Sequence, residues 1–348
     1  MDRTNRTRRT PRTPRRLRGA LAATAACTAT LLLLVSGCSS SSGGKKAQEA
    51  AEGLNAGRAD TPRMKVAMIT HGAPGDTFWD IVRKGAQTAA KKDNIKLIYS
   101  SSPKAAEQAN FIQNAIDQKV DGIAVTAAKP DAVEGAVRKA RKAGIPVVGL
   151  NAGLDTWQKM DMLSFFGQDE RLTGEAFGER LNEEGAEHAL CVIHEQGSVA
   201  LEARCAGVRE TFDGTLETLY VNGADMPSVQ SKLTAKLQQQ KAIDYVVTLG
   251  APFAMTAIQS VDEAGSDAKI ATFDLNKDLV RAVRGGDIVF AVDQQPFLQG
   301  YLAIDELWLY VNNGNFSGGG EKPVLTGPAF VTKENIDEIA EFAERGNR

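Results

Sequence analysis

The strongest constraint on the fold is a regular alternation of short apolar runs with longer segments of helical periodicity. Strands that alternate with helices predict βαβ units and parallel sheets. The apolar runs are nearly continuous, which is typical of strands that helices cover on both faces. The runs of a first series are Lys65–Thr70, Lys96–Ser100, Gly122–Thr126, Val147–Leu150 and Leu163–Phe166. The runs of a second series are Leu190–His194, Glu217–Val221, Tyr245–Leu249, Ile270–Phe273 and Ile288–Val292.

Two such series predict an α/β protein of two similar doubly wound parallel-sheet lobes with a ligand cleft between them. A helix over Pro296–Asn313, a strand over Pro323–Val331 and a helix over Lys333–Arg345 complete the pattern. The chain is expected to cross between the lobes three times, near Gly167, Gln295 and Pro323, which makes a three-strand hinge. The first lobe is expected to contain residues 64–167 and 296–322, and the second residues 168–295 and 323–348.

The N-terminal 37 residues combine a basic start, an apolar core and a small-residue end, which is the layout of a secretory signal peptide. The segment ends at Val35-Ser36-Gly37-Cys38, which resembles the bacterial lipobox, where the cysteine is acylated and becomes the first mature residue. Residues 38–63 read as a flexible, lipid-anchored tether. The alternative is an uncleaved membrane anchor, since residues 19–35 approach the length of a spanning helix. An extracytoplasmic protein anchored to the cell membrane is predicted.

Removal of the signal peptide exposes an acidic protein. The whole chain has a net charge of −2, but residues 1–37 hold eight arginines and one aspartate, so the remainder carries about −9. That balance argues against nucleic acid or an anionic lipid surface as the partner. We expect a monomer.

Two cysteines remain in the mature domain, because Cys27 leaves with the signal peptide and Cys38 is the expected lipidation site. Cys191 lies in an apolar strand-like run, and Cys205 lies in the helical segment that follows it. Neighbouring elements of this kind can bring two Cα atoms within bonding range, and disulfides persist outside the cytoplasm. Two buried thiols are the alternative. No His or further Cys lies at ligand spacing, so no metal site is expected.

Polar and aromatic side chains gather just after the predicted strands, where open α/β sheets bind their ligands. These candidate ligand-binding residues are Asp76, Phe78, Trp79, Asn151, Gln168, Asp169, Arg204, Asp274 and Gln294. Amides, carboxylates and arginine make paired hydrogen bonds to neighbouring hydroxyls. Aromatic rings stack on the C–H faces of a sugar ring. The set predicts a site for a small sugar or polyol, and it contains no evident nucleophile–base pair.

From Met64 to Val331 the chain resembles the ribose- and galactose-type sugar-binding proteins of bacterial ABC importers. The resemblance rests on Asp76-Thr77-Phe78-Trp79, Asn151, Arg204 with Gly207, Thr272-Phe273-Asp274 and Gln294-Gln295-Pro296. It implies the type 1 periplasmic binding protein fold, ligand contacts from these residues, and delivery of the ligand to an ABC permease. Ala152 replaces a frequent Arg, and Gly250-Ala251 replace a usual Asn. These departures favour another sugar or a cyclitol over ribose.

Other functions remain open at the level of sequence. A sensor subunit that presents a bound sugar to a membrane receptor would use the same closed lobes. An extracytoplasmic carbohydrate-active enzyme is less favoured, because the chain has no Gly-x-Ser-x-Gly, His-Glu-x-x-His, P-loop or Gly-x-Gly-x-x-Gly motif. We therefore expect neither catalysis nor a cofactor.

Overall fold

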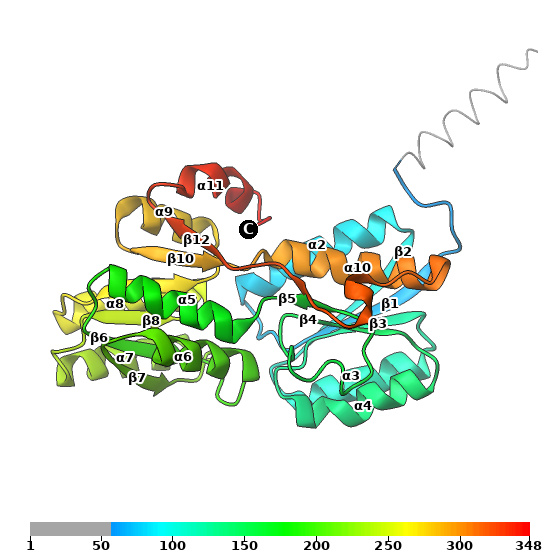
Figure 1. Ribbon diagram of the computed structural model, residues 1–348, viewed down its shortest axis with the longest axis horizontal. Helices are drawn as coiled ribbons and strands as arrows, with labels where there is room; N and C mark the ends of the chain where they lie inside the picture. Colours follow the sequence, from blue (N-terminus) through cyan, green and yellow to red (C-terminus); the bar gives the residue numbers. More distant parts are fainter. Residues whose placement is uncertain (1–56) are drawn as a thin grey trace, which may run out of the picture. The chain divides into compact units, whose positions relative to one another are not determined.

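Two six-stranded sheets organise the computed structural model, which describes residues 57–348 (Figure 1). The first sheet is entirely parallel, in the order β11-β5-β4-β3-β1-β2. Its strands are β1 (Met64–Thr70), β2 (Ile95–Ser101), β3 (Gly122–Val125), β4 (Val147–Leu150), β5 (Phe165–Gly167) and β11 (Val324–Leu325). The signal peptide, Cys38 and most of the expected tether lie outside the described residues.

The second sheet has the order β12-β10-β9-β8-β6-β7, and only β12 is antiparallel to its neighbour. Its strands are β6 (His188–Ile193), β7 (Thr215–Tyr220), β8 (Tyr245–Thr248), β9 (Lys269–Phe273), β10 (Phe290–Asp293) and β12 (Ala329–Thr332). The prediction of two α/β lobes with mainly parallel sheets is confirmed.

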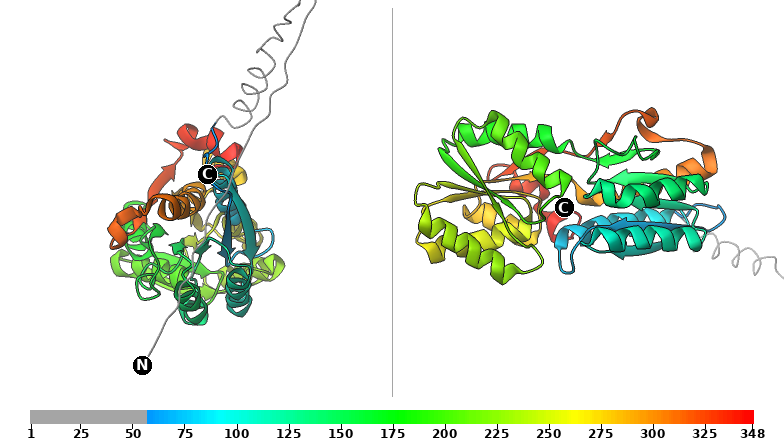
Figure 2. Two further views of the ribbon diagram at one scale, coloured as in Figure 1. Left: turned by 90° about the vertical axis from the view of Figure 1, so that its right-hand side faces the viewer. Right: turned by 90° about the horizontal axis from the view of Figure 1, so that it is seen from below.

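Helices cover both faces of each sheet (Figure 2). In β1, Val66 and Met68 pack under α2 and α10, whereas Ala67 and Ile69 pack under α3 and α4. The first-lobe helices are α2 (Thr77–Lys92), α3 (Ala105–Asp117), α4 (Pro130–Lys142) and α10 (Pro296–Asn313), followed by the short 3-10 turn η1 (Ser317–Gly320). The second-lobe helices are α5 (Glu170–Glu183), α6 (Val199–Thr211), α7 (Met226–Gln239), α8 (Ala251–Ala264), α9 (Lys277–Gly285) and α11 (Ile336–Glu344). Opposite faces of a central strand are thus buried, which explains the continuous apolar runs.

Helix α10 returns to the first lobe and lies beside α2 (Figure 1). The two helices approach closely because each contributes a glycine to the contact. A Cβ atom added at Gly85 would lie 1.9 Å from the Phe297 carbonyl oxygen, and one at Gly300 would lie 1.9 Å from that of Val82. This packing fixes where the second crossing enters the first lobe.

The strand predicted over Pro323–Val331 is wrong, because two short strands replace it. β11 pairs with β5 in the first sheet, and β12 pairs with β10 in the second. The third crossing therefore lies at residues 326–328, between the two strands, rather than near Pro323. Residues 323–325 accordingly belong with the first sheet.

Hydrogen bonds tie the three crossings to one another. The Thr326 backbone N–H donates to the Gly167 carbonyl at 2.7 Å, and the Thr326 hydroxyl donates to the Gln294 carbonyl at 2.8 Å. The Gln295 side-chain amide donates to the Thr326 carbonyl at 2.7 Å. The crossings thus form one connected hinge beside the cleft.

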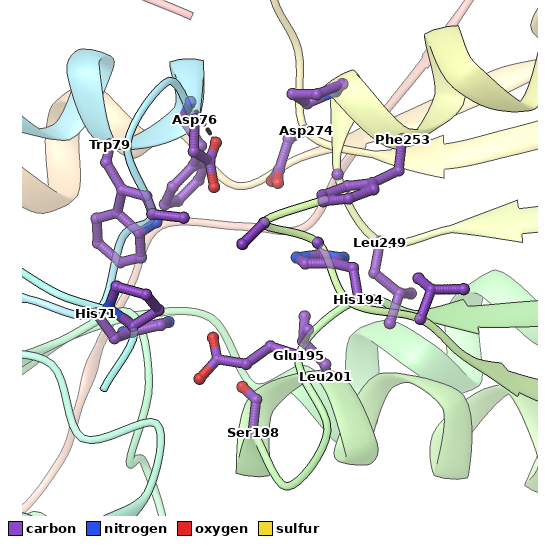
Figure 3. Close-up of a pocket in the computed structure, with 18 of the residues that line it drawn as sticks. His71, Asp76, Trp79, His194, Glu195, Ser198, Leu201, Leu249, Phe253 and Asp274 are labelled. Atoms are coloured by element: carbon purple, nitrogen blue, oxygen red, sulfur yellow. Dashed lines mark hydrogen bonds between the residues drawn. The ribbon is translucent and has the colours of Figure 1, made fainter. Parts of the chain in front are cut away.

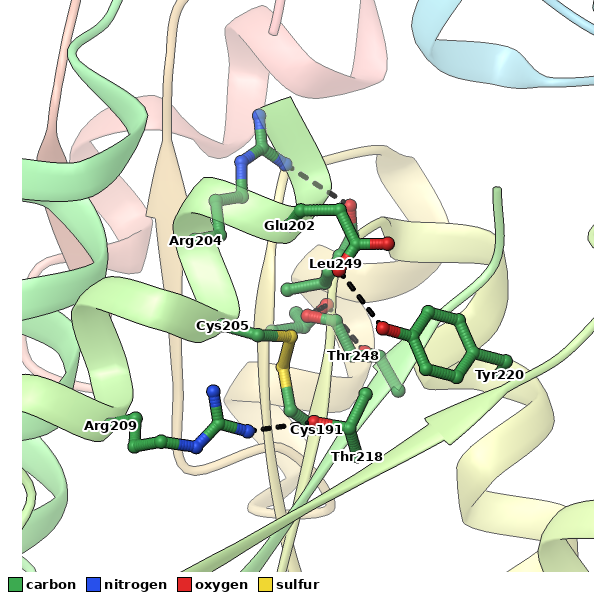
Figure 4. The surroundings of a disulfide bond; sticks show 10 residues. Cys191, Glu202, Arg204, Cys205, Arg209, Thr218, Tyr220, Thr248 and Leu249 are labelled. Carbon is green, nitrogen blue, oxygen red and sulfur yellow. Dashed lines mark hydrogen bonds between the residues drawn. A yellow bond between two sulfur atoms is a disulfide. The ribbon is translucent and has the colours of Figure 1, made fainter. Parts of the chain in front are cut away.

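Cys191 on β6 and Cys205 on α6 are joined by a disulfide bond, with their Cα atoms 6.1 Å apart (Figure 4). Both residues are buried in the core that α5 and α6 form with the second sheet. The bridge fixes the first half of α6, which carries Arg204, against the sheet.

Candidate functional site

A cavity of about 660 Å³ lies between the lobes, beyond the carboxyl ends of their strands. Residues from both lobes line it, as Figure 3 shows for Asp76 and Trp79 on one side and Asp274 and His194 on the other. Of the nine predicted ligand-binding residues, the cavity lining includes Asp76, Phe78, Trp79, Asn151, Arg204, Asp274 and Gln294. Seven of the nine predicted residues therefore line one cavity.

Gln168 and Asp169 are not part of the cavity lining. Helix α5 begins directly after them, and the Asp169 carboxylate accepts hydrogen bonds from the backbone N–H groups of Arg171 and Leu172. Gln168 is fully buried in the first crossing and donates to Glu170 at 2.7 Å. The predicted ligand contact of these two side chains is therefore not supported by the cavity, because the start of α5 uses the Asp169 carboxylate and the hinge buries Gln168.

Arg204 is buried, and the Glu170 carboxylate holds it through two hydrogen bonds. Its Nε donates to Glu170 Oε2 at 2.5 Å and its Nη2 to Oε1 at 2.9 Å, while Nη1 donates to the Leu249 carbonyl at 3.2 Å. The guanidinium carbon lies 4.7 Å from the centre of the Phe273 ring. Burial acts to lower the pKa of Arg204, but the charge and hydrogen bonds of Glu170 together with the charge of Asp274 outweigh burial and raise that pKa. Arg204 is therefore a fixed cation in the cavity wall.

An amide network crosses from one lobe to the other. Asn151, after β4, donates to Gln294 Oε1 at 3.1 Å and to Gln299 Oε1 at 3.3 Å. Gln294, in the second crossing, donates in turn to Asp274 Oδ1 at 2.5 Å. Asn151 and Asp274 both have a positive φ, of 63° and 67°, a conformation that asparagine and aspartate tolerate better than most residues. The network aligns amide and carboxylate groups along the hinge side of the cavity.

Two carboxylates approach the cavity from opposite lobes. Asp76 caps the N-terminus of α2 by accepting a hydrogen bond from the Phe78 backbone N–H at 3.0 Å. Burial raises the pKa of Asp76 to about 6, against the effect of that hydrogen bond. Burial likewise raises the pKa of Asp274 to about 7, although the Arg204 charge and the Gln294 hydrogen bond oppose the shift. Each carboxylate is thus less solvated than it would be in water. Hydroxyl groups of a ligand could donate the missing hydrogen bonds.

An aromatic wall closes the first-lobe side. Phe78 and Trp79 both line the cavity, and their rings meet edge to face with centroids 5.0 Å apart. Trp79 also meets the His71 ring at 4.6 Å, and His71 Nδ1 hydrogen-bonds the Thr126 hydroxyl at 2.7 Å. Both rings of the pair are nearly buried, so they pack on the core as well as on the cavity.

The predicted ligand-binding set omits several cavity residues, including the stacked pair His194 and Phe253. Their rings lie 3.9 Å apart. A Cβ atom at Gly250 would lie only 3.3 Å from Phe253, so these rings occupy part of the room that the absent Asn side chain was expected to leave. Burial lowers the pKa of His194 and of His71 to about 3, so both rings are neutral at physiological pH. The sequence signal that could have identified His194 as a cavity residue is its position directly after β6.

Three further contacts join the lobes across the cleft. Lys129 Nζ lies 3.3 Å from Glu195 Oε1, and the Val199 backbone N–H donates to the Ala128 carbonyl at 2.9 Å. The Asn276 side chain donates to the Thr77 hydroxyl at 3.3 Å. The lobes are thus closed on one another in this structure.

The assembled groups suit the recognition of hydroxyls. Arg204 supplies donors, the two aspartates supply acceptors, and the amides supply both. Within residues 57–348, no group of three or more His, Cys, Asp or Glu side chains is arranged to hold a metal ion. In the same range, no helix is long and apolar enough to cross a membrane.

We expect the stability of the ligand-free protein, relative to an Asp274→Asn variant, to fall as the pH rises from about 4 to about 7. The pKa of Asp274 is raised from 3.8 to about 7, so over this range the folded state retains a proton that the unfolded state has released. Stability from this group is therefore complete below pH 3.8 and is lost as the pH passes about 7. Asparagine can still accept from Gln294 but does not titrate. Denaturant unfolding of both proteins across this range tests the expectation, and a difference that does not vary with pH would contradict it.

Comparison with known proteins adds to this geometry. Residues 66–315 match the family described as periplasmic binding protein domain. A carbohydrate transporter from Acidothermus cellulolyticus, solved in complex with myo-inositol, is 54% identical with a TM-score of 0.82, over 82% of this chain and 100% of that one. An ABC transporter solute-binding protein from Agrobacterium vitis, with bound D-fucose, is 26% identical with a TM-score of 0.72, over 80% and 99%. The xylose/arabinose-binding protein of Sulfolobus acidocaldarius is 26% identical over 79% of this chain and 72% of its own length.

Proposed function

Because the chain belongs to the periplasmic binding protein family, and its relatives are sugar-binding proteins of ABC importers rather than enzymes, we propose that it captures a small cyclic polyol of the myo-inositol type. It then delivers that ligand to an ABC permease. The observation that carries the proposal is the pair of carboxylates, Asp76 and Asp274, that approach one cavity from opposite lobes (Figure 3). Arg204 lines the same cavity, and its charge acts on Asp274.

A cyclitol matches this arrangement because it has a hydroxyl on every ring carbon. Hydroxyls on one side of the ring can donate to Asp76 while those on the other side donate to Asp274 and accept from Arg204. The ring faces, which carry C–H groups, can stack on the aromatic wall. The myo-inositol bound to the 54%-identical carbohydrate transporter supports this ligand class. Contacts from both lobes would stabilise the closed form, which the permease would recognise.

A thermal-shift panel tests the ligand class. myo-Inositol, D-xylose, L-arabinose and D-fucose are compared at equal concentrations with the mature chain. We expect myo-inositol to give the largest rise in melting temperature, because at equal concentration the ligand with the lowest Kd stabilises the folded state most. A ligand at 100 times its Kd stabilises the folded state by about 2.7 kcal/mol. A shift with a pentose and none with myo-inositol would contradict the proposal.

The emission of Trp79 is expected to report binding. Stacking and lost apolar burial predict that Trp79→Ala weakens ligand binding by roughly 1–3 kcal/mol. In Trp79→Phe, the ligand-induced change in tryptophan fluorescence should largely disappear. Trp308→Phe is the matched control, because Trp308 lies on α10 and hydrogen-bonds Thr61, outside the cavity lining. Loss of the signal in the control alone would mean that Trp79 does not contact ligand.

We also propose that Cys38 carries the lipid anchor. The Val35-Ser36-Gly37-Cys38 segment supports it, as does membership of an extracytoplasmic family. Cys38→Ala is expected to move the protein from the membrane fraction to the soluble fraction. Fractionation and mass spectrometry of the N-terminal peptide provide the measurement. An unmodified Cys38 in membrane-bound wild type would refute the anchor.

A further inference from the structure

The environment of Arg204 leaves only part of its hydrogen-bonding capacity free. An arginine side chain has five N–H donors in a planar fork. One side of the fork, formed by Nε and Nη2, is occupied by Glu170, and Nη1 gives one donor to the Leu249 carbonyl. The donors left over are on the two terminal nitrogens, Nη1 and Nη2. Because Arg204 lines the cavity, this end of the fork is the part available to a ligand.

Glu170 is in turn held by the hinge. Its Oε2 accepts from Gln168 Nε2 at 2.7 Å, in addition to its bond from Arg204. Gln168 lies in the first crossing, and its Oε1 packs close to Gly327 of the third crossing, where an added Cβ atom would lie 2.9 Å away. A continuous series of contacts therefore runs from two hinge crossings through Gln168 and Glu170 to Arg204.

We propose that Glu170 is a positioning residue for ligand binding. By occupying the side of the guanidinium, it leaves Nη1 and Nη2 with one N–H donor each for a neighbouring pair of ligand oxygens. Paired donors of this geometry recognise paired acceptors with more directional specificity than a single donor. Through Gln168, the same carboxylate links the orientation of Arg204 to the hinge. This inference rests on the proposed function, in which Arg204 contacts the ligand.

A purely structural role for Glu170 would be to neutralise a buried cation. The two roles differ in what a second substitution does. If Glu170 acts on the ligand only through Arg204, removing Glu170 has no further effect on binding once the Arg204 guanidinium is gone. If Glu170 only supports the fold, its loss weakens stability without a binding effect that depends on Arg204.

Glu306 offers a matched control. It is also a buried glutamate, 2% exposed against 5% for Glu170, and it accepts hydrogen bonds from Ser164 and from Ser317. It lies on α10 and is not part of the cavity lining. Glu306→Gln should therefore disturb a buried carboxylate without changing ligand affinity.

Calorimetric titration of the mature chain with myo-inositol tests the inference, using Glu170→Gln, Glu306→Gln, Arg204→Met and the Glu170→Gln/Arg204→Met double variant. We expect Glu170→Gln to weaken binding roughly tenfold to a hundredfold, the size of a lost charged hydrogen bond. The Glu306→Gln variant should bind as wild type does. The double variant should bind no more weakly than Arg204→Met. Wild-type affinity in Glu170→Gln, or additive losses in the double variant, would overturn the positioning role.

Glu170→Gln leaves a buried guanidinium without its counter-charge, so a second variant is included. Gln168→Met removes the donor that holds Glu170 but leaves no charge unpaired, and we expect it to weaken binding about threefold to tenfold. Unchanged affinity in Gln168→Met would contradict the link to the hinge, whatever the fate of Glu170→Gln. A wild type that does not bind myo-inositol contradicts the proposed function. If the wild type binds myo-inositol and the variants bind it with the same affinity, only the proposed role of Glu170 is contradicted.

Discussion

Replacing Arg204 with alanine is expected to weaken ligand binding by about 1.5–3 kcal/mol and to lower the free energy of unfolding by about 3–5 kcal/mol. The loss of stability follows because Glu170 is 5% exposed and would keep a buried charge with no cation beside it. The loss of binding follows because the free donors of Arg204 belong to the cavity wall. Denaturant unfolding and calorimetric titration of the same preparation measure the two effects.

The matched control for Arg204→Ala is an exposed ion pair between the same two helices. Arg171 on α5 pairs with Glu210 on α6, and its side chain is 54% exposed. Arg171→Ala should change stability by less than about 1 kcal/mol and leave binding unchanged, since exposed pairs contribute little. Equal losses of stability in the two variants would contradict the expectation that the buried Glu170–Arg204 pair contributes more to stability than an exposed pair.

Removing the disulfide, by replacing both Cys191 and Cys205 with alanine, is expected to lower the free energy of unfolding by about 3 kcal/mol. The bridge spans a sequence separation of 14, and closing a loop of this length restricts the unfolded chain by about that amount. Because the loop includes His194, Glu195 and Arg204, the double variant should also bind ligand more weakly.

Reductant separates the bridge from the volume of the two side chains. Equilibrium unfolding with and without reductant is measured for wild type and for the double-alanine variant. Reductant should shift the wild-type midpoint to lower denaturant concentration and leave the variant unchanged. A wild type that does not respond to reductant would mean that the two cysteines are unbonded thiols.

The strands could be predicted because their signal is local. Val147–Leu150 has the same bounds as β4, and Tyr245–Leu249 exceeds β8 by one residue, since a buried parallel strand shows as a continuous apolar run. The predicted strand over Pro323–Val331 instead divides into β11 and β12, which belong to different sheets. The Gly327-Pro328 pair between β11 and β12 was the sequence signal for this break, because Gly-Pro pairs mark turns and loops.

The candidate site could be predicted as far as strand ends determine it. Asp76, Asn151, Asp274 and Gln294 each follow a strand, and the topology brings their side chains to one cavity. Gln168 and Asp169 also follow a strand, but a helix start and the hinge use their side chains instead. The Glu170–Arg204 pair could not be predicted, because its partners are 34 residues apart and their contact depends on how α5 packs on α6.

The most direct test of a cyclitol-binding cleft is a calorimetric titration of the mature chain with myo-inositol, repeated with Asp274→Ala. Both titrations are run at about pH 8, where an Asp274 carboxyl with a pKa of about 7 is mostly ionised. The account predicts a single saturable site in wild type. It also predicts that the variant weakens binding by at least about 1.5–3 kcal/mol, because a charged acceptor of the ligand hydroxyls is lost. A wild type that shows no saturable heat change with myo-inositol, or a variant that binds it as tightly as wild type, would contradict the account.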